Sequence, residues 1–229
     1  MRVVRFSHQE AIRYGIVDEG EIVVLAGDPM FAGFETTGER VALGDIALLA
    51  PVIPRSKVVC VGKNYRDHAA EMGGEAPAVP LLFLKPNTAV IGPGDAIVRP
   101  PQSARTDFEG ELGVYISKPA YRVSVEEAWD YVGGFTVLND VSGRRAQLET
   151  PMKQFTLGKS FGTFTPVGPA VVSMDSFADA EARDNLPVRT TLSGEVMQDG
   201  NTNQFIFTIP EIVSYLSQGV TLEPGDLIA

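Results

Sequence analysis

The chain has 229 residues, of which 44% are hydrophobic and 21% are charged, so it has the composition of a globular protein with one large domain and room for a small second one. Its 29 acidic residues outnumber 19 basic residues, and the formal net charge is -10. This charge disfavours nucleic acid as a partner, because basic contacts to phosphate supply most of that affinity. No apolar stretch reaches membrane-spanning length and no signal-peptide pattern opens the chain, so we expect a cytoplasmic protein without a membrane partner.

The first fifty residues predict short strands separated by turns, at 1–7, 12–18 and 21–27. A linker is expected within 48–57, because Pro51 and Pro54 suit neither a helix interior nor a central strand. We therefore expect a small N-terminal β-rich domain at 1–52 and a main domain at 53–229.

The main domain is predicted to be mainly β with few helices, an α+β arrangement. Strand-like segments are expected at 57–62, 81–86, 89–101, 108–117 and 133–142, and a hairpin at 188–200. Helices are expected at 66–72, at 125–132 behind a capping box of Ser124 and Glu127, and at 210–218 between Pro210 and Gly219. Residues 224–229 resemble a turn followed by the start of a strand, so we expect the chain to continue beyond Ala229.

Two glutamates stand two residues apart, Glu109 and Glu111, and a strand directs such positions to the same face. Asp140 ends the apolar run FTVLND, at the mouth of another buried strand. Like charges this close repel unless a cation lies between them, and three oxygen ligands favour Mg²⁺ or Mn²⁺, with Ca²⁺ as an alternative. From local sequence alone, a solvated strand face paired with Arg or Lys remains the competing interpretation.

Three more residues are candidates for a catalytic role. His68 and Glu71 are three apart, a helical spacing at which Glu can orient His as a general base, although an exposed helix pair fits equally well. Lys159 is enclosed by glycine, aromatic residues and proline. It is either a partly buried cation that stabilises an oxyanion or a loop lysine lying over Phe155 and Phe161.

Six motifs resemble, in order, the successive motifs of the fumarylacetoacetate hydrolase family over about residues 53–229: KVVCVGKNYRDHAAEM, LLFLKPNTAV, DFEGELGVYISK, YVGGFTVLNDVSGRR, LGKSFGTFTPVGP and LEPGDLIA. The resemblance implies a mixed β-sandwich roll, a homodimer, one Mg²⁺ or Mn²⁺ per subunit and a small 2-oxo acid substrate.

The resemblance also implies nine site residues. The implied metal ligands are Glu109, Glu111 and Asp140. The implied catalytic residues are His68 and Glu71, a dyad on a lid over the substrate, and Lys159. The implied contacts to the substrate carboxylate are Arg144, Gln147 and Lys63. Four positions depart from the family pattern and bear on substrate choice: Arg145 and Gly162 replace aspartates, and Phe155 and Leu157 replace a frequent Trp and Arg.

These residues predict hydrolytic C–C cleavage of an acylpyruvate or fumarylacetoacetate-type substrate. In this prediction the His68–Glu71 pair activates water, while the metal and Lys159 stabilise the enolate that cleavage leaves. The same site suits two alternatives, isomerisation of 5-carboxymethyl-2-hydroxymuconate and decarboxylation of oxaloacetate. A further alternative is a catalytically idle module that binds a small dicarboxylate.

Overall fold

The computed structural model describes residues 1–66 and 77–229. Its N-terminal strands are β1 (Arg2–His8), β2 (Ala11–Asp18), β3 (Glu21–Leu25), β4 (Thr36–Ala42) and β5 (Ala47–Leu49), with the single-turn helix α1 (Pro29–Ala32) between β3 and β4. Neighbouring strands β1 to β4 pair antiparallel, and β5 pairs with the other side of β1. The predicted N-terminal strands are therefore confirmed.

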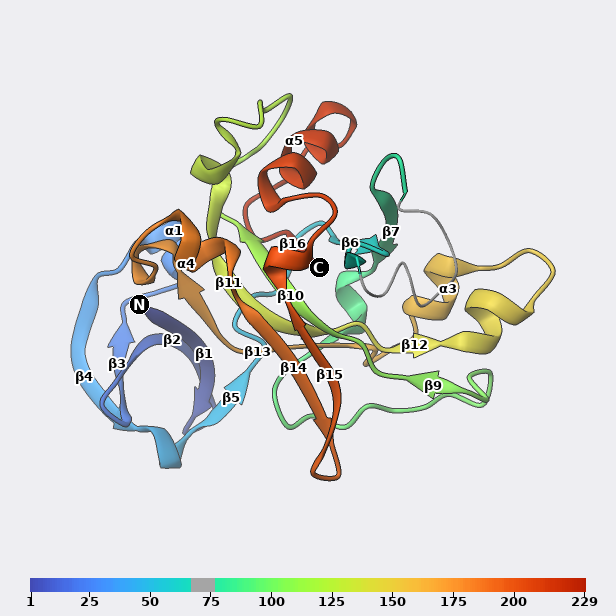
Figure 1. Ribbon diagram of the computed structural model, residues 1–229. Helices are drawn as coiled ribbons and strands as arrows, with labels where there is room; N and C mark the ends of the chain where they lie inside the picture. Colours follow the sequence, from blue (N-terminus) through green and yellow to red (C-terminus); the bar gives the residue numbers. More distant parts are fainter. Residues whose placement is uncertain (67–76) are drawn as a thin grey trace.

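The main sheet continues from β1 into strands that the chain contributes much later (Figure 1). These are β6 (Val58–Gly62), β7 (Leu81–Lys85), β8 (Val90–Ile91), β10 (Gly110–Ile116), β11 (Val132–Asn139), β13 (Thr165–Ser173) and β16 (Leu227–Ile228). The path runs β4-β3-β2-β1-β13-β11-β10-β16-β6-β7, with β8 beside β13. The mainly β architecture expected from the sequence is confirmed.

Two small sheets lie beside this large one. The first joins β9 (Thr106–Asp107) to β12 (Ser142–Gly143), and the second is the hairpin of β14 (Pro187–Leu192) and β15 (Glu195–Asn201). Ser193 and Gly194 both have positive φ, as a tight two-residue hairpin turn requires. The hairpin lies against the start of β10, where the Gly110 amide donates to Gln198 Oε1 at 2.7 Å.

One long helix, α5 (Ile209–Gly219), covers the main core. It begins at the capping box of Thr208 and Glu211, confirming the helix predicted there. Its apolar side packs on β10 and β11, in a cluster that includes Val114, Phe135 and Val213. None of the helices in the described ranges is long and apolar enough to cross a membrane.

Two expectations were wrong. The helix predicted at 125–132 is a turn followed by the 3-10 segment Ala128–Tyr131. Ser124 and Glu127 do make the predicted contact, at 3.3 Å from the Glu127 amide to Ser124 Oγ, but Val132 already pairs with Ile116 as the first residue of β11, so the helix cannot lengthen. In the strand-like stretch 89–101 only β8 forms. The helix predicted at 66–72 falls almost entirely outside the described residues.

Candidate active site

The end of the β10–β11 ladder brings two predicted ligands together. Gly110 faces Asn139 in this antiparallel pair, and the next step outward links the Asp140 amide to the Glu109 carbonyl at 2.8 Å. Residues directly opposite each other in a sheet carry side chains a few ångströms apart. The ladder alone therefore places the carboxylates of Glu109 and Asp140 on one site.

Lys159 lies at the end of the short helix α3 (Phe155–Lys159) and is only 2% exposed. Its ammonium donates to Glu109 Oε2 at 2.5 Å and to Asp140 Oδ2 at 2.6 Å. Burial lowers the pKa of this lysine, but the two carboxylates outweigh burial and raise the pKa above its ordinary value. Lys159 is therefore a buried cation at the end of a helix and not a loop lysine over Phe155 and Phe161; the ring that its ammonium approaches is that of Phe83, with 4.9 Å between Nζ and the centroid.

Glu111 lies in β10, two residues after Glu109, and also lines the cleft. Burial, reinforced by the charges of Glu109 and Asp140 and opposed by Lys159, raises the pKa of Glu111 to about 8. No described residue donates a hydrogen bond to its carboxylate. The surroundings of this carboxylate therefore disfavour its negative charge, and a nearby cation would stabilise that charge.

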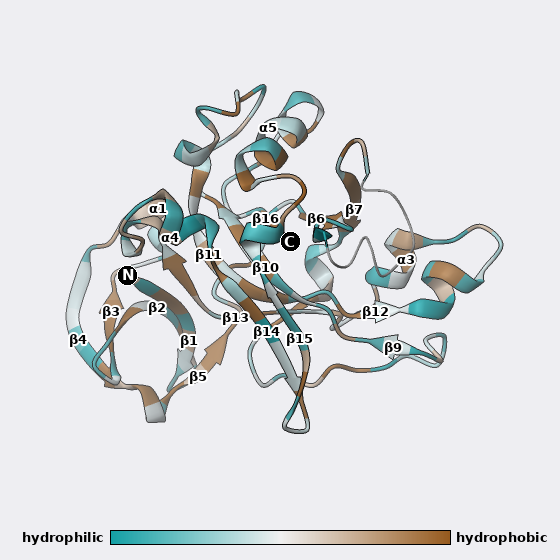
Figure 2. Ribbon diagram, in the orientation of Figure 1, coloured by the Kyte–Doolittle hydropathy of each residue, from teal (hydrophilic) through white to brown (hydrophobic). Residues whose placement is uncertain are grey.

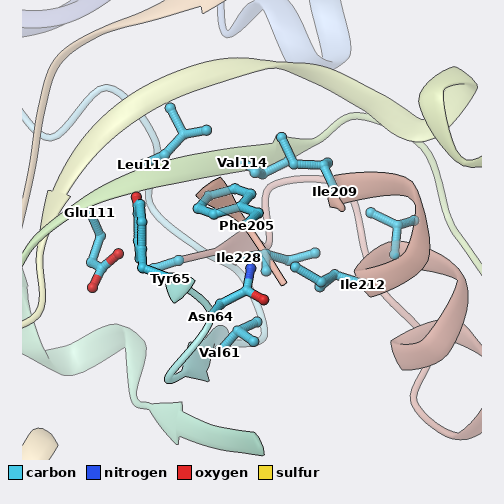
Figure 3. A pocket seen from close by; sticks show the side chains of 12 residues that line it. Val61, Asn64, Tyr65, Glu111, Leu112, Val114, Phe205, Ile209, Ile212 and Ile228 are labelled. Carbon is cyan, nitrogen blue, oxygen red and sulfur yellow. The ribbon is translucent and has the colours of Figure 1, made fainter. Parts of the chain in front are cut away.

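Tyr65 lines, together with Glu111, a small and mainly apolar pocket of about 30 Å³ (Figure 3). Its ring meets Phe205 edge to face at 4.9 Å between centroids. The hydroxyl of Tyr65 is buried and finds no partner among residues 1–66 and 77–229, and burial together with the charge of Glu111 raises its pKa. Polar and apolar parts of the site thus meet at this tyrosine.

Arg144 follows β12 and makes three charge-assisted or polar contacts. Its guanidinium donates to Asp107 Oδ2 at 2.8 Å, to Glu109 Oε1 at 2.6 Å and to Gln147 Oε1 at 2.8 Å. Burial lowers the pKa of the Arg144 guanidinium, but the carboxylates of Asp107 and Glu109 raise it by more than burial lowers it. The pKa therefore lies above its ordinary value, and the side chain stays charged. Gln147 is buried in the π-helical turn Arg145–Glu149. The two predicted carboxylate contacts therefore lie side by side.

All seven predicted site residues within the described ranges line one cleft of about 490 Å³. They are Lys63, Glu109, Glu111, Asp140, Arg144, Gln147 and Lys159. Lys63 stands apart from the others, because its ammonium makes no hydrogen bond to a described residue. The predicted dyad residues His68 and Glu71 lie outside the described part of the chain.

Apolar side chains surround the mouth of this cleft. Leu81, Leu148 and Met197 line it while remaining 42%, 44% and 50% exposed. Leu81 belongs to β7, which is hydrophobic along most of its length (Figure 2). The charged floor and the apolar mouth give the cleft two chemically different ends.

Two charged neighbours of the site were missed at the sequence level. Lys85 ends β7, is fully buried and donates to Asp140 Oδ1 at 2.6 Å. Asp107 anchors Arg144. A lysine at the end of the apolar run LLFLK was the available signal for the first. An aspartate two residues before Glu109 was the signal for the second.

The carboxylates suit a divalent ion by their chemistry, since hard oxygen donors are what Mg²⁺, Mn²⁺ and Ca²⁺ prefer. Glu109 and Asp140 already converge on one cation, the Lys159 ammonium. Within the described ranges, however, no three Asp, Glu, His or Cys side chains are grouped closely enough to hold a metal ion together. Metal binding at this site therefore requires Lys159 to yield its place between the two carboxylates.

Known proteins are similar to this chain in sequence and in fold. The chain is 46% identical over 184 residues to the oxaloacetate tautomerase FAHD2A, mitochondrial, of Bos taurus, a match that covers 80% of this chain and 58% of the relative. The chain thus spans well under two thirds of this curated relative. Among solved structures, a 2-hydroxyhepta-2,4-diene-1,7-dioate isomerase from Mycobacterium marinum superposes with a TM-score of 0.86 at 37% identity, covering 100% of this chain and 85% of the other.

A 5-carboxymethyl-2-hydroxymuconate delta-isomerase from Mycobacterium smegmatis gives a TM-score of 0.86 at 34% identity, over 100% of this chain and 86% of the other. Residues 1–51 match the family described as Rv2993c-like, N-terminal. Residues 57–229, which carry the whole cleft, match the fumarylacetoacetate hydrolase C-terminal family. The chain therefore belongs to the fumarylacetoacetate hydrolase family.

Proposed function

We propose that this protein is a divalent-metal-dependent enzyme that tautomerises a small 2-oxo acid of the oxaloacetate type. The observation that carries the proposal is the convergence of Lys159 with Glu109 and Asp140 on the floor of the cleft, beside Glu111. Relatives named as oxaloacetate tautomerases and as isomerases of 2-hydroxy-dienedioates support a reaction that moves a proton without breaking the carbon chain.

In the proposed reaction a proton leaves the carbon next to the 2-oxo group and a proton is added to the oxygen, so atoms balance without water. Glu109, Glu111 and Asp140 would hold the ion, which when bound supplies a Lewis acid for the oxygen that gains negative charge. With the ion between Glu109 and Asp140, the Lys159 ammonium would supply a second positive charge beside that oxygen. Arg144 and Gln147 orient the substrate carboxylate, because a guanidinium matches carboxylate geometry. His68 and Glu71 are proposed as the proton carriers.

Hydrolytic cleavage of an acylpyruvate, the reaction expected from the sequence, is the second candidate. The apolar mouth favours it, because Leu81, Leu148 and Met197 would contact an acyl group better than a second carboxylate. This reaction consumes one water molecule and needs the His68–Glu71 pair to activate it.

An assay with three substrates, in which four reactions are followed, tests the proposal. The purified protein with Mg²⁺ or Mn²⁺ would be given oxaloacetate, acetylpyruvate and 5-carboxymethyl-2-hydroxymuconate, while keto–enol conversion, decarboxylation, C–C cleavage and isomerisation are followed separately. We expect keto–enol conversion of oxaloacetate that disappears after chelation and returns with metal. Faster cleavage of acetylpyruvate would favour the second candidate. Thermal stabilisation by these acids without any turnover would identify the idle binding module.

We also propose a homodimer in the cytoplasm, as the family resemblance and the composition predict. Light scattering after size exclusion tests the dimer, and a mass of one chain would reject it. The bovine relative is named as mitochondrial, so fractionation of the native cells is the test of location.

A further inference from the structure

Lys85 is the most deeply buried charged side chain near the site, with 0% exposure. Its ammonium donates to Asp140 Oδ1 at 2.6 Å, to the Lys159 carbonyl at 2.5 Å and to the Val141 carbonyl at 3.3 Å. An ammonium has three N–H donors, so these three acceptors satisfy it completely. A buried charge is tolerated only when it is paired and hydrogen-bonded in this way.

The two oxygens of the Asp140 carboxylate accept hydrogen bonds from different lysines. Lys85 takes Asp140 Oδ1, while Oδ2 accepts from Lys159, which lines the cleft. Lys85 itself does not line the cleft. It therefore approaches Asp140 from the protein side, fixes the rotation of the carboxylate and leaves Oδ2 as the oxygen on the cleft side.

The same ammonium also holds the backbone from which Lys159 extends. The Lys159 carbonyl lies at the C-terminal end of α3, where backbone carbonyls lack intrahelical partners. A hydrogen bond of 2.5 Å to that carbonyl fixes the helix end against β7. One buried cation thus sets the position of a carboxylate and of the lysine that competes for it.

We propose that Lys85 is a positioning residue of the active site, which holds Asp140 Oδ2 and the base of Lys159 in the geometry that metal binding and turnover require. This inference rests on the proposed metal-dependent function. Lys85 touches neither the cleft nor the substrate, so it acts through Asp140 and Lys159. Groups that orient the ligands of a metal commonly change metal affinity or activity 10–100-fold when removed.

The competing explanation is that Lys85 only stabilises the fold. The chain supplies a matched control in Lys57, whose ammonium is 2.5 Å from Asp226 Oδ2. Asp226 is fully buried and the side chain of Lys57 is 15% exposed, so this is another largely buried Lys–Asp pair. Neither Lys57 nor Asp226 lines the cleft. A role in stability alone would make the two lysines behave alike.

The test compares Lys85→Met with Lys57→Met in the full chain. Mn²⁺ affinity is measured directly by electron paramagnetic resonance of free Mn²⁺, and kcat and KM for oxaloacetate are measured at saturating Mn²⁺, after circular dichroism has shown that each variant is folded. We expect Lys85→Met to weaken Mn²⁺ binding at least about 10-fold and to lower kcat at saturating metal. Lys57→Met should lower the melting temperature and leave Mn²⁺ affinity and kcat within about twofold of wild type.

Lys85→Gln, which keeps a neutral donor, carries the same test if Lys85→Met does not fold, and should also weaken Mn²⁺ binding. Wild-type Mn²⁺ affinity in a folded Lys85 variant would overturn the positioning role while leaving the proposed function intact. Loss of fold in both Lys85 variants, with Lys57→Met folded, would overturn it in favour of a structural role. Absence of Mn²⁺ binding by the wild-type protein would overturn the metal-dependent function and this inference together.

Discussion

Asp140 donates its backbone amide to the Glu109 carbonyl at 2.8 Å, and both side chains accept from the same ammonium, that of Lys159. The backbone contact extends the β10–β11 ladder by one step beyond the Gly110–Asn139 pair, so the sheet holds these two acidic residues opposite each other. Their mutual repulsion is offset by a cation that the protein itself supplies. This arrangement makes Lys159 both a stabilising partner of the carboxylates and a competitor of any metal ion they bind.

Lys159→Met should separate these two roles. Turnover should fall at least about 100-fold, because a fixed positive charge at a developing oxyanion is worth that much. The metal-free variant should be less stable by about 1–3 kcal/mol, since Asp140 and Glu109 each lose one cationic partner but keep the other, Lys85 or Arg144. Mn²⁺ affinity should stay equal or increase, because the competing ammonium is gone. Calorimetric titration and urea unfolding measure these effects.

The exposed Lys153 provides the matched control for that variant. Lys153→Met removes the same charge from the same region of the chain and should change neither activity nor stability by a measurable amount. If Lys159→Met bound Mn²⁺ more weakly than wild type, Lys159 would support the ion and not compete with it.

Glu111 should make the stability of the metal-free protein depend on pH. Its pKa is about 8 in the folded protein, against an ordinary pKa of 4.5 for a glutamate in an unfolded chain. Between these pH values the folded protein binds the proton more tightly, so stability falls as pH rises from about 4.5 to about 8. Glu111→Gln should remove most of this loss in the free energy of unfolding, which in the wild-type protein is on the order of a few kcal/mol at pH 9. Urea unfolding of the chelator-treated protein across this range measures it.

Bound metal should oppose this fall in stability at high pH, because metal binding needs the deprotonated carboxylate of Glu111. Mn²⁺ should therefore stabilise wild type more at pH 9 than at pH 6. Glu126→Gln, at an exposed position, is the control and should follow the wild-type curve. A metal-free wild-type protein as stable at pH 9 as at pH 6 would show that Glu111 is not held in an unfavourable environment.

The sequence could predict those residues of the cleft whose positions follow from strand geometry. Glu109 and Glu111 share a face because a strand has a period of two, and Asp140 was found because it ends an apolar run. Lys85 also ends an apolar run, LLFLK, but this position alone does not predict a role in the site, since the burial of a lysine depends on which distant groups surround its ammonium. Local sequence also cannot show where a helix must stop. The segment 125–132 has a genuine cap, but sheet pairing at Val132 overrides it.

Asp226 should contribute to stability without contributing to catalysis. It is fully buried, and its carboxylate accepts from Lys57 Nζ, from Ser56 Oγ and from the Glu223 amide at 2.5, 2.6 and 2.9 Å. These contacts fasten the turn before β16 to the start of β6. Asp226→Ala should lower the free energy of unfolding by about 3–5 kcal/mol, because it leaves buried donors unpaired. At a temperature where the variant is folded, kcat and Mn²⁺ affinity should equal those of wild type. A selective loss of Mn²⁺ affinity would contradict this purely structural role.

Gly158 should affect catalysis only because it lets α3 pack closely against the neighbouring backbone. A Cβ at this position would lie 2.8 Å from the Gln147 amide nitrogen and 2.9 Å from the Gly143 carbonyl, closer than real Cβ contacts. Gly158→Ala must therefore push α3 away from this backbone, and Lys159 is the next residue. Overpacking of this kind costs about 1–3 kcal/mol, and kcat should fall more than KM changes because a displaced ammonium no longer meets the reacting oxygen. Gly162→Ala is the matched control, since its Cβ would meet nothing within 4 Å, and it should behave as wild type. Equal kcat in the two variants would show that the close approach of α3 does not set the position of Lys159.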